Sequence, residues 1–131
     1  AMEDILLREI ERTGKVLEAI LMKLGLMRQR NETGSYAVAA AAAKEELGIE
    51  LTPLLADPEI ARTLVAVHGF GESDLEKFAQ MLYLLAATAS DDDTRHRTAA
   101  ASAALYRHLE AHGSCCFFDR YYILRELERY L

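Results

Sequence analysis

Residues 3–27 read EDILLREIERTGKVLEAILMKLGLM, and their apolar side chains return every three or four positions. This is the period of one face of an α-helix, so the stretch predicts a long amphipathic helix. The repeating positions are Leu6, Ile10, Leu17, Ile20, Leu21 and Leu24. Further apolar residues widen this stripe beyond the narrow seam of a two-stranded coiled coil, namely Ile5, Leu7, Val16 and Met27. We therefore expect this helix to contact more than one neighbour.

The polar side of the same helix carries opposite charges four positions apart, Asp4 with Arg8 and Glu11 with Lys15. An acidic residue placed four positions before a basic one favours an ion pair along a helix. We expect both pairs to form on the solvent side.

Helical patterns also cover the rest of the chain. We expect helices at about 35–47, 58–67, 73–89, 91–111 and 118–131, with one further turn opening at Thr52-Pro53. Gly48 and Gly113 are expected to end two of them, and Ser73 with Glu76 has the spacing of a capping box. No segment alternates apolar and polar residues as a strand would. The sequence thus predicts one all-α domain over residues 1–131, a right-handed array of about five to seven antiparallel helices with the long N-terminal helix packed along the others.

Length, composition and charge argue against several classes of protein. A chain of 131 residues with 51% hydrophobic residues can bury a core of its own, which favours a single globular domain. The formal net charge is −6 and no basic stripe stands out, so we expect no binding to nucleic acid. No apolar run approaches the roughly 20 residues that a membrane helix needs, so we expect no membrane partner.

The opening segment and the cysteines favour the cytoplasm. Acidic and basic residues interrupt the apolar positions of residues 1–15, which does not resemble a secretory signal. Cys115 and Cys116 are adjacent, and adjacent cysteines rarely meet the geometry of an ordinary disulfide. We therefore expect a cytoplasmic protein.

Four residues near the end of the chain are candidate metal ligands: His108, His112, Cys115 and Cys116. Two imidazoles four positions apart share a helical face, and with two thiolates they could hold Zn²⁺. However, the spacing matches no standard zinc module. The alternative is that the histidines border a packed face near a helix C-terminus and the cysteines are small buried apolar residues. We favour this alternative and expect no metal and no other cofactor.

No combination of residues predicts a catalytic site. The run from Asp91 to Asp93 lacks the spacing of a calcium loop, and we expect it to cap and stabilise the start of a helix. A cysteine near a histidine could begin a nucleophilic site, but nothing supplies an oxyanion hole or an orienting third group. We expect a protein that is not an enzyme.

Most aromatic residues lie in the last third of the chain. Tyr121 and Tyr122 are neighbours on a predicted helix, so both cannot face inward. At least one is expected to be exposed or at an interface, and tyrosine is favoured in binding surfaces. These two residues are therefore candidates for contact with a partner.

Two resemblances rest on particular stretches. Small and large residues alternate in DLEKFAQMLYLLA (74–86) and AAASAALYRHLEAH (99–112), and FFDRYYILRELERYL (117–131) follows. Residues 75–131 resemble the helix hairpins of tetratricopeptide-like proteins, without their strict 34-residue repeat, so the resemblance implies an architecture and transfers no ligand. Together with EDILLREIERTGKVLEAIL (3–21) and AAKEELGIELTPLL (42–55), the closing stretch is also similar to a family of uncharacterised bacterial helical proteins. That family brings no activity to this chain.

These features favour a non-catalytic protein–protein interaction or scaffolding module whose partner is a protein or peptide. Helix arrays leave grooves in which amphipathic helices or peptides dock. A small metal- or ligand-binding regulatory protein that uses His108, His112, Cys115 and Cys116 is the alternative. The wide apolar face of the first helix also raises a homodimer as one possibility, with a monomer whose other helices cover the whole stripe as the other.

Overall fold

The computed structural model describes the backbone of residues 2–113 and 118–131, and the side chains of residues 8, 11–113 and 120–131. Seven α-helices and no strand occur in these two ranges, which confirms the predicted all-α fold. They are α1 (Met2–Gln29), α2 (Ser35–Leu47), α3 (Leu51–Leu55), α4 (Ile60–Ala66), α5 (Glu72–Ala87), α6 (Asp92–His112) and α7 (Phe118–Glu128). None of these helices combines the length and the apolar character that crossing a bilayer requires.

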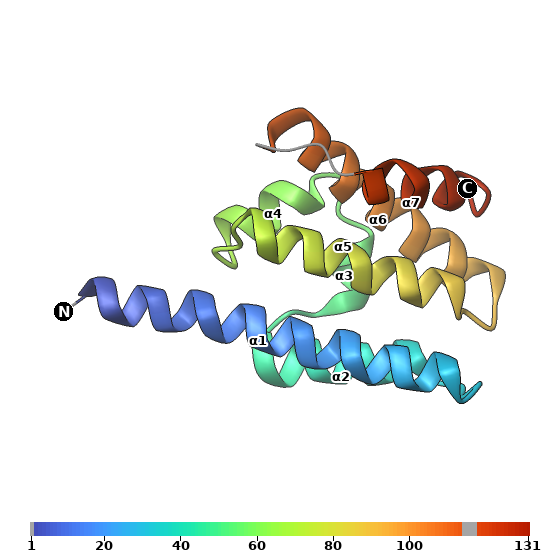
Figure 1. The fold of residues 1–131 in the computed structure, drawn as a ribbon, viewed down its shortest axis with the longest axis horizontal. Coiled ribbons are helices and arrows are strands. Elements are labelled where there is room, and N and C mark those ends of the chain that lie inside the picture. Colours follow the sequence, from blue (N-terminus) through green and yellow to red (C-terminus); the bar gives the residue numbers. More distant parts are fainter. Residues whose placement is uncertain (1, 114–117) are drawn as a thin grey trace.

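Helix α5 lies at the centre of the array, with α1 packed on one side and α6 on the other (Figure 1). Helix α2 packs along α1, and α4 and α7 lie against α6. The large, fully buried side chains come mainly from the three central helices and include Leu17, Phe78, Met81, Leu82, Leu85 and Leu105. Helix α1 therefore contacts both α5 and α2, as the width of its apolar stripe predicted.

Small residues line the contact between α5 and α6. Ala79, Ala86, Ala99 and Ala103 are fully buried. The hydroxyl of Ser102, which is also buried, donates a hydrogen bond of 2.7 Å to the carbonyl oxygen of Ala79. This bond satisfies a hydroxyl that would otherwise cost free energy in the core.

Two predicted helix caps are present. Gly48 follows α2 with a left-handed φ of 66°, and the N–H groups of Gly48 and Ile49 bond the carbonyls of Lys44 and Ala43 at 3.2 and 3.0 Å. The Asp91 carboxylate accepts hydrogen bonds from the N–H of Thr94 at 2.7 Å and from its hydroxyl at 2.8 Å. These bonds hold the pKa of Asp91 below its ordinary value. The aspartate run therefore caps α6, as expected.

Two helices start at other residues than predicted. Helix α3 begins at Leu51, and the hydroxyl of Thr52 bonds the Tyr36 hydroxyl of α2 at 2.7 Å instead of capping a helix. Helix α4 begins at Ile60, two residues after Pro58. Asp57 accepts bonds from the N–H of Glu59 and the hydroxyl of Thr63, so it shapes the turn before α4 rather than its first residue.

The capping box predicted for Ser73 and Glu76 is wrong. Helix α5 begins at Glu72, and the Asp74 carboxylate accepts a 3.2 Å hydrogen bond from the N–H of Gly71. Glu76 has a different partner, because its carboxylate accepts a 2.7 Å bond from the guanidinium of Arg120 in α7. Glu76, which the local spacing assigned to a helix cap, thus forms a long-range ion pair with Arg120 instead.

Two polar contacts join α7 to α5. The Arg120 side chain is only 3% exposed, and it lies 2.7 Å from the Glu76 carboxylate and 3.8 Å from that of Glu72. Further along, the Tyr83 hydroxyl of α5 donates a 2.5 Å hydrogen bond to Glu126 of α7. Both contacts orient α7 along α5 while Leu124 and Leu127 add apolar contact to the core.

The N-terminal end of α1 extends past the other helices (Figure 1). Helix α1 meets the first turn of α5 near Gly14, where an added Cβ would lie 3.3 Å from the Lys77 ammonium and 3.8 Å from the Asp74 carboxylate. Residues 2–10 precede this meeting point and continue as helix into open space. We call residues 2–10 the overhang.

Candidate functional site

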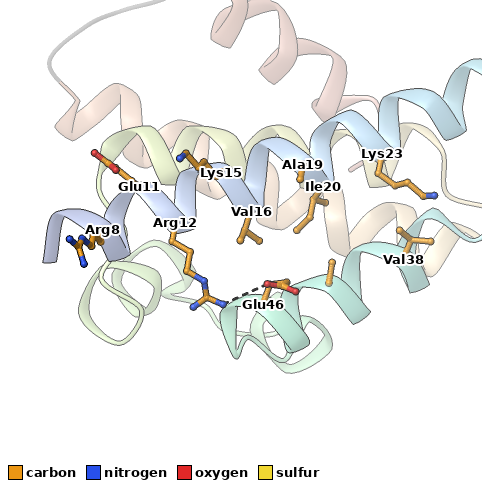
Figure 2. Close-up of a pocket in the computed structure, with 11 residues that line it drawn as sticks. Arg8, Glu11, Arg12, Lys15, Val16, Ala19, Ile20, Lys23, Val38 and Glu46 are labelled. Carbon is orange, nitrogen blue, oxygen red and sulfur yellow. Dashed lines mark ion pairs between the residues drawn. The ribbon is translucent and has the colours of Figure 1, made fainter. Parts of the chain in front are cut away.

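A groove of about 620 Å³ lies between α1 and α2. It is lined by eight residues of α1 and three of α2: Arg8, Glu11, Arg12, Lys15, Val16, Ala19, Ile20, Lys23, Val38, Ala42 and Glu46 (Figure 2). We call it the α1/α2 groove.

The floor of the α1/α2 groove is apolar. Val16 and Ile20 of α1 point toward α2, and Val38 of α2 faces them (Figure 2). Helix α2 is rich in alanine, and Ala42 is its second contribution to the floor. Because alanine side chains are short, they leave room that larger residues would fill. The short side chain of Ala42 therefore helps to keep the groove open.

The rim of the α1/α2 groove carries more positive than negative charge. Arg8, Arg12, Lys15 and Lys23 are the cations, against the carboxylates of Glu11 and Glu46. Arg12 and Glu46 pair across the two helices at 3.6 Å, with both side chains exposed. Lys15 and Lys23 have no carboxylate within ion-pair distance among the described side chains. The rim is therefore locally positive on a chain whose net charge is −6.

The predicted ion pair between Glu11 and Lys15 is not formed. Side chains at that spacing pair only weakly in water, so both remain solvated on the rim. The Asp4 side chain, predicted to pair with Arg8, lies outside the described side chains.

Exposed apolar residues continue the groove face along α1. Met22 is 70% exposed and Leu26 is 42% exposed. They follow Ala19 by three and seven positions, a spacing that keeps them on one side of a helix. The apolar surface near the groove is thus longer than the hollow itself.

The candidate metal ligands are only partly within the described ranges. His108 and His112 lie on α6 with their ring centroids 4.7 Å apart, and Cys115 and Cys116 fall outside those ranges. No group of three or more histidine, cysteine or acidic side chains gathers in a metal-binding arrangement among the described residues. The histidine pair is next to Glu72 and Gly113 in a small hollow of about 240 Å³.

Tyr121 and Tyr122 are both exposed on α7, at 52% and 66%. Their rings meet edge to face, with centroids 5.5 Å apart. The Arg125 guanidinium lies 5.7 Å from the centre of the Tyr121 ring and donates a 3.2 Å bond to its hydroxyl. The sequence required one exposed tyrosine here, and the structure exposes two.

The α1/α2 groove was missed by sequence reasoning. Its one sequence signal is the series Arg8, Arg12, Lys15, Ala19 and Lys23, whose steps of three and four place it on one face of α1. From the sequence alone, such a series indicates a solvated polar face of a helix. Only the packing of α2 beside α1 shows that these residues form the rim of a groove.

Comparisons of this chain with models of protein families, with curated proteins and with solved structures found no match.

Proposed function

We propose that this protein is a non-catalytic protein–protein interaction module, and that the α1/α2 groove binds an amphipathic helix with an acidic polar face. The observation that carries the proposal is the apolar floor with a positive rim on an otherwise acidic chain. The array would then be a tetratricopeptide-like helical stack in a bacterial cytoplasmic protein. In such arrays, helices and peptides dock between neighbouring helices.

The floor and the rim of the α1/α2 groove would contribute different interactions to binding of the partner. Apolar side chains of the partner, spaced by three and four positions, would cover Val16, Ala19 and Val38 and remove apolar surface from water. Carboxylates of the partner would approach Lys15 and Lys23, which accelerates association and selects against basic helices. The partner class follows from these two chemistries.

Binding of a designed peptide tests the proposal. The probe is a fluorescent helical peptide with leucines at positions i, i+3 and i+7 and glutamates flanking them. We expect anisotropy to show saturable binding, and we expect Ala19→Glu to weaken it at least tenfold, since Ala19 lies exposed on the groove. Val67→Glu, at a site 71% exposed on another surface, is the matched control and should change nothing. Equal binding by both variants would refute the groove as the site.

Tyr121 and Tyr122 are proposed as a second contact surface on α7. Their exposure leaves two large amphipathic rings available to a partner, and tyrosine is common among residues that dominate binding energy. The double replacement Y121A/Y122A should then weaken capture of a partner already identified through the groove.

The second candidate function is a metal- or ligand-binding regulatory protein that uses His108, His112, Cys115 and Cys116. It is favoured by one observation, the 4.7 Å separation of the two imidazole rings on α6. Elemental analysis of the purified protein tests it. Stoichiometric zinc that is lost in the double variant His108→Gln and His112→Gln would support this candidate.

A further inference from the structure

The overhang and the α1/α2 groove are complementary in chemistry. Residues 2–10 read MEDILLREI, with three carboxylates against one arginine and an apolar residue at five of the nine positions. Apart from Arg8, which belongs to both, the groove offers an apolar floor and a rim with three cations against two carboxylates. One chain thus carries both an acidic amphipathic helical segment and the kind of surface that would bind one.

The two features also match in length. Nine helical residues span about 13 Å, and the groove follows α1 from Arg8 to Lys23, about 22 Å. The overhang can therefore lie along the groove without leaving it. Apart from Arg8, whose side chain lines the near end of the groove, it cannot reach the groove of its own chain, because it continues the same straight helix that forms one wall of that groove (Figure 1).

We propose that the α1/α2 groove is occupied by the overhang of a second copy of this chain. This inference rests on the proposed function, since it names the partner of the same groove. The two α1 helices would lie antiparallel about a twofold axis. Each overhang would then enter the groove of the other copy, so both grooves are filled and the assembly closes as a dimer.

The charged residues of the overhang and of the groove indicate how the two segments would be oriented. The overhang carries Glu3 and Asp4 at its tip, and in the antiparallel arrangement this tip points past Lys15, at the middle of the partner's groove, toward the end that holds Lys23. The apolar floor provides the favourable burial, while these charges set the direction in which the overhang enters. The interface is small, so we expect dimers that dissociate on dilution.

Light scattering coupled to size exclusion tests the inference across a dilution series. At high concentration we expect the wild-type protein to have twice the mass of one chain, and one chain mass on dilution. Raising the salt to about 1 M should move the transition to higher protein concentration, because ion pairs are screened within about 3 Å at that ionic strength. A mass of one chain at every concentration would overturn the inference.

A charge-swap experiment tests which residues meet. The groove variant is K15E/K23E and the overhang variant is E3K/D4K. Each alone places like charges together and should be monomeric. Mixed in equal amounts they should form a heterodimer, since the acidic overhang of the first meets the basic groove of the second, and the reverse. If a variant had lost the dimer only because its helix had frayed, mixing would not restore dimer formation.

The control R107E/R129E changes the net charge as much as the groove variant does, at two exposed arginines away from the groove, and should leave the dimer intact. The designed acidic peptide separates this inference from the proposed function. A wild-type monomer that still binds the peptide overturns the dimer and leaves the proposed function standing. A dimer that the peptide converts to peptide-bound monomer supports both, and a protein that neither dimerises nor binds the peptide refutes both.

Discussion

At the scale of single residues, Tyr83 has the clearest electrostatic signature in the described structure. Burial, the hydrogen bond to Glu126 and the negative charge of that carboxylate raise the pKa of Tyr83 to about 12. The ordinary value is 10.0, so the folded protein retains this proton over a range in which the unfolded chain loses it. Its contribution to stability is therefore complete below pH 10 and is lost as the pH rises toward 12.

We expect Tyr83→Phe to flatten the alkaline part of the stability profile. The wild-type free energy of unfolding should fall faster between pH 10 and 12 than that of the variant, because only the wild-type residue titrates. Near neutral pH the variant should be less stable by about 1 kcal/mol through the lost hydrogen bond. Urea unfolding at a series of pH values measures both effects. Parallel alkaline slopes would contradict the assignment.

At the scale of elements, α7 is attached to the array by charge as well as by apolar contact. Arg120 is buried against Glu76 and Glu72, whose side chains are 24% and 42% exposed. A buried ion pair is costly to break, because the partner that remains is left without compensation. The exposure of the two glutamates lowers this cost, since water can reach them.

We therefore expect Arg120→Ala to lower the free energy of unfolding by about 2–4 kcal/mol. Arg62→Ala is the matched control, since Arg62 pairs with Glu59 at 3.2 Å while both side chains are largely exposed. Such a surface pair contributes between 0 and about 1 kcal/mol. Chemical denaturation of the two variants measures the difference. Equal losses of unfolding free energy in the two variants would mean that burial does not strengthen the contribution of the Arg120 ion pairs to stability.

The sequence predicted the elements better than it predicted their ends. The periods of apolar residues located the long helices, because burial of one helical face is a local property of the chain. The starts of α4 and α5 were misplaced, because Asp57 and Glu76 bond to residues other than those a local cap would use. The partner of Glu76 is Arg120, in a distant segment that spacing along the chain does not reveal, whereas Asp57 bonds the nearby Glu59 and Thr63.

At the scale of the whole molecule, the candidate site is a product of packing. The α1/α2 groove requires a charged face of α1, an alanine-rich α2 and the placement of one beside the other. The first two are readable in the sequence, and the third is not. In contrast, the exposure of at least one of Tyr121 and Tyr122 follows from their adjacency, which is why it could be predicted, and the structure exposes both.

The thinness of α2 has a consequence for motion within the native state. The buried residues of α2 are Ser35, Ala39 and Ala43, whereas α5 buries eight residues, among them Phe78 and Leu82. Little apolar surface therefore opposes the detachment of α2, and segments with few buried contacts open at a lower free energy than the core does. Hydrogen exchange should show amides of α2 exchanging by such local opening well before those of α5, with equal protection of the two helices as the contrary result. One wall of the groove would then open and close many times during the life of the folded protein, so a bound helix should slow the exchange of α2 more than that of any other helix.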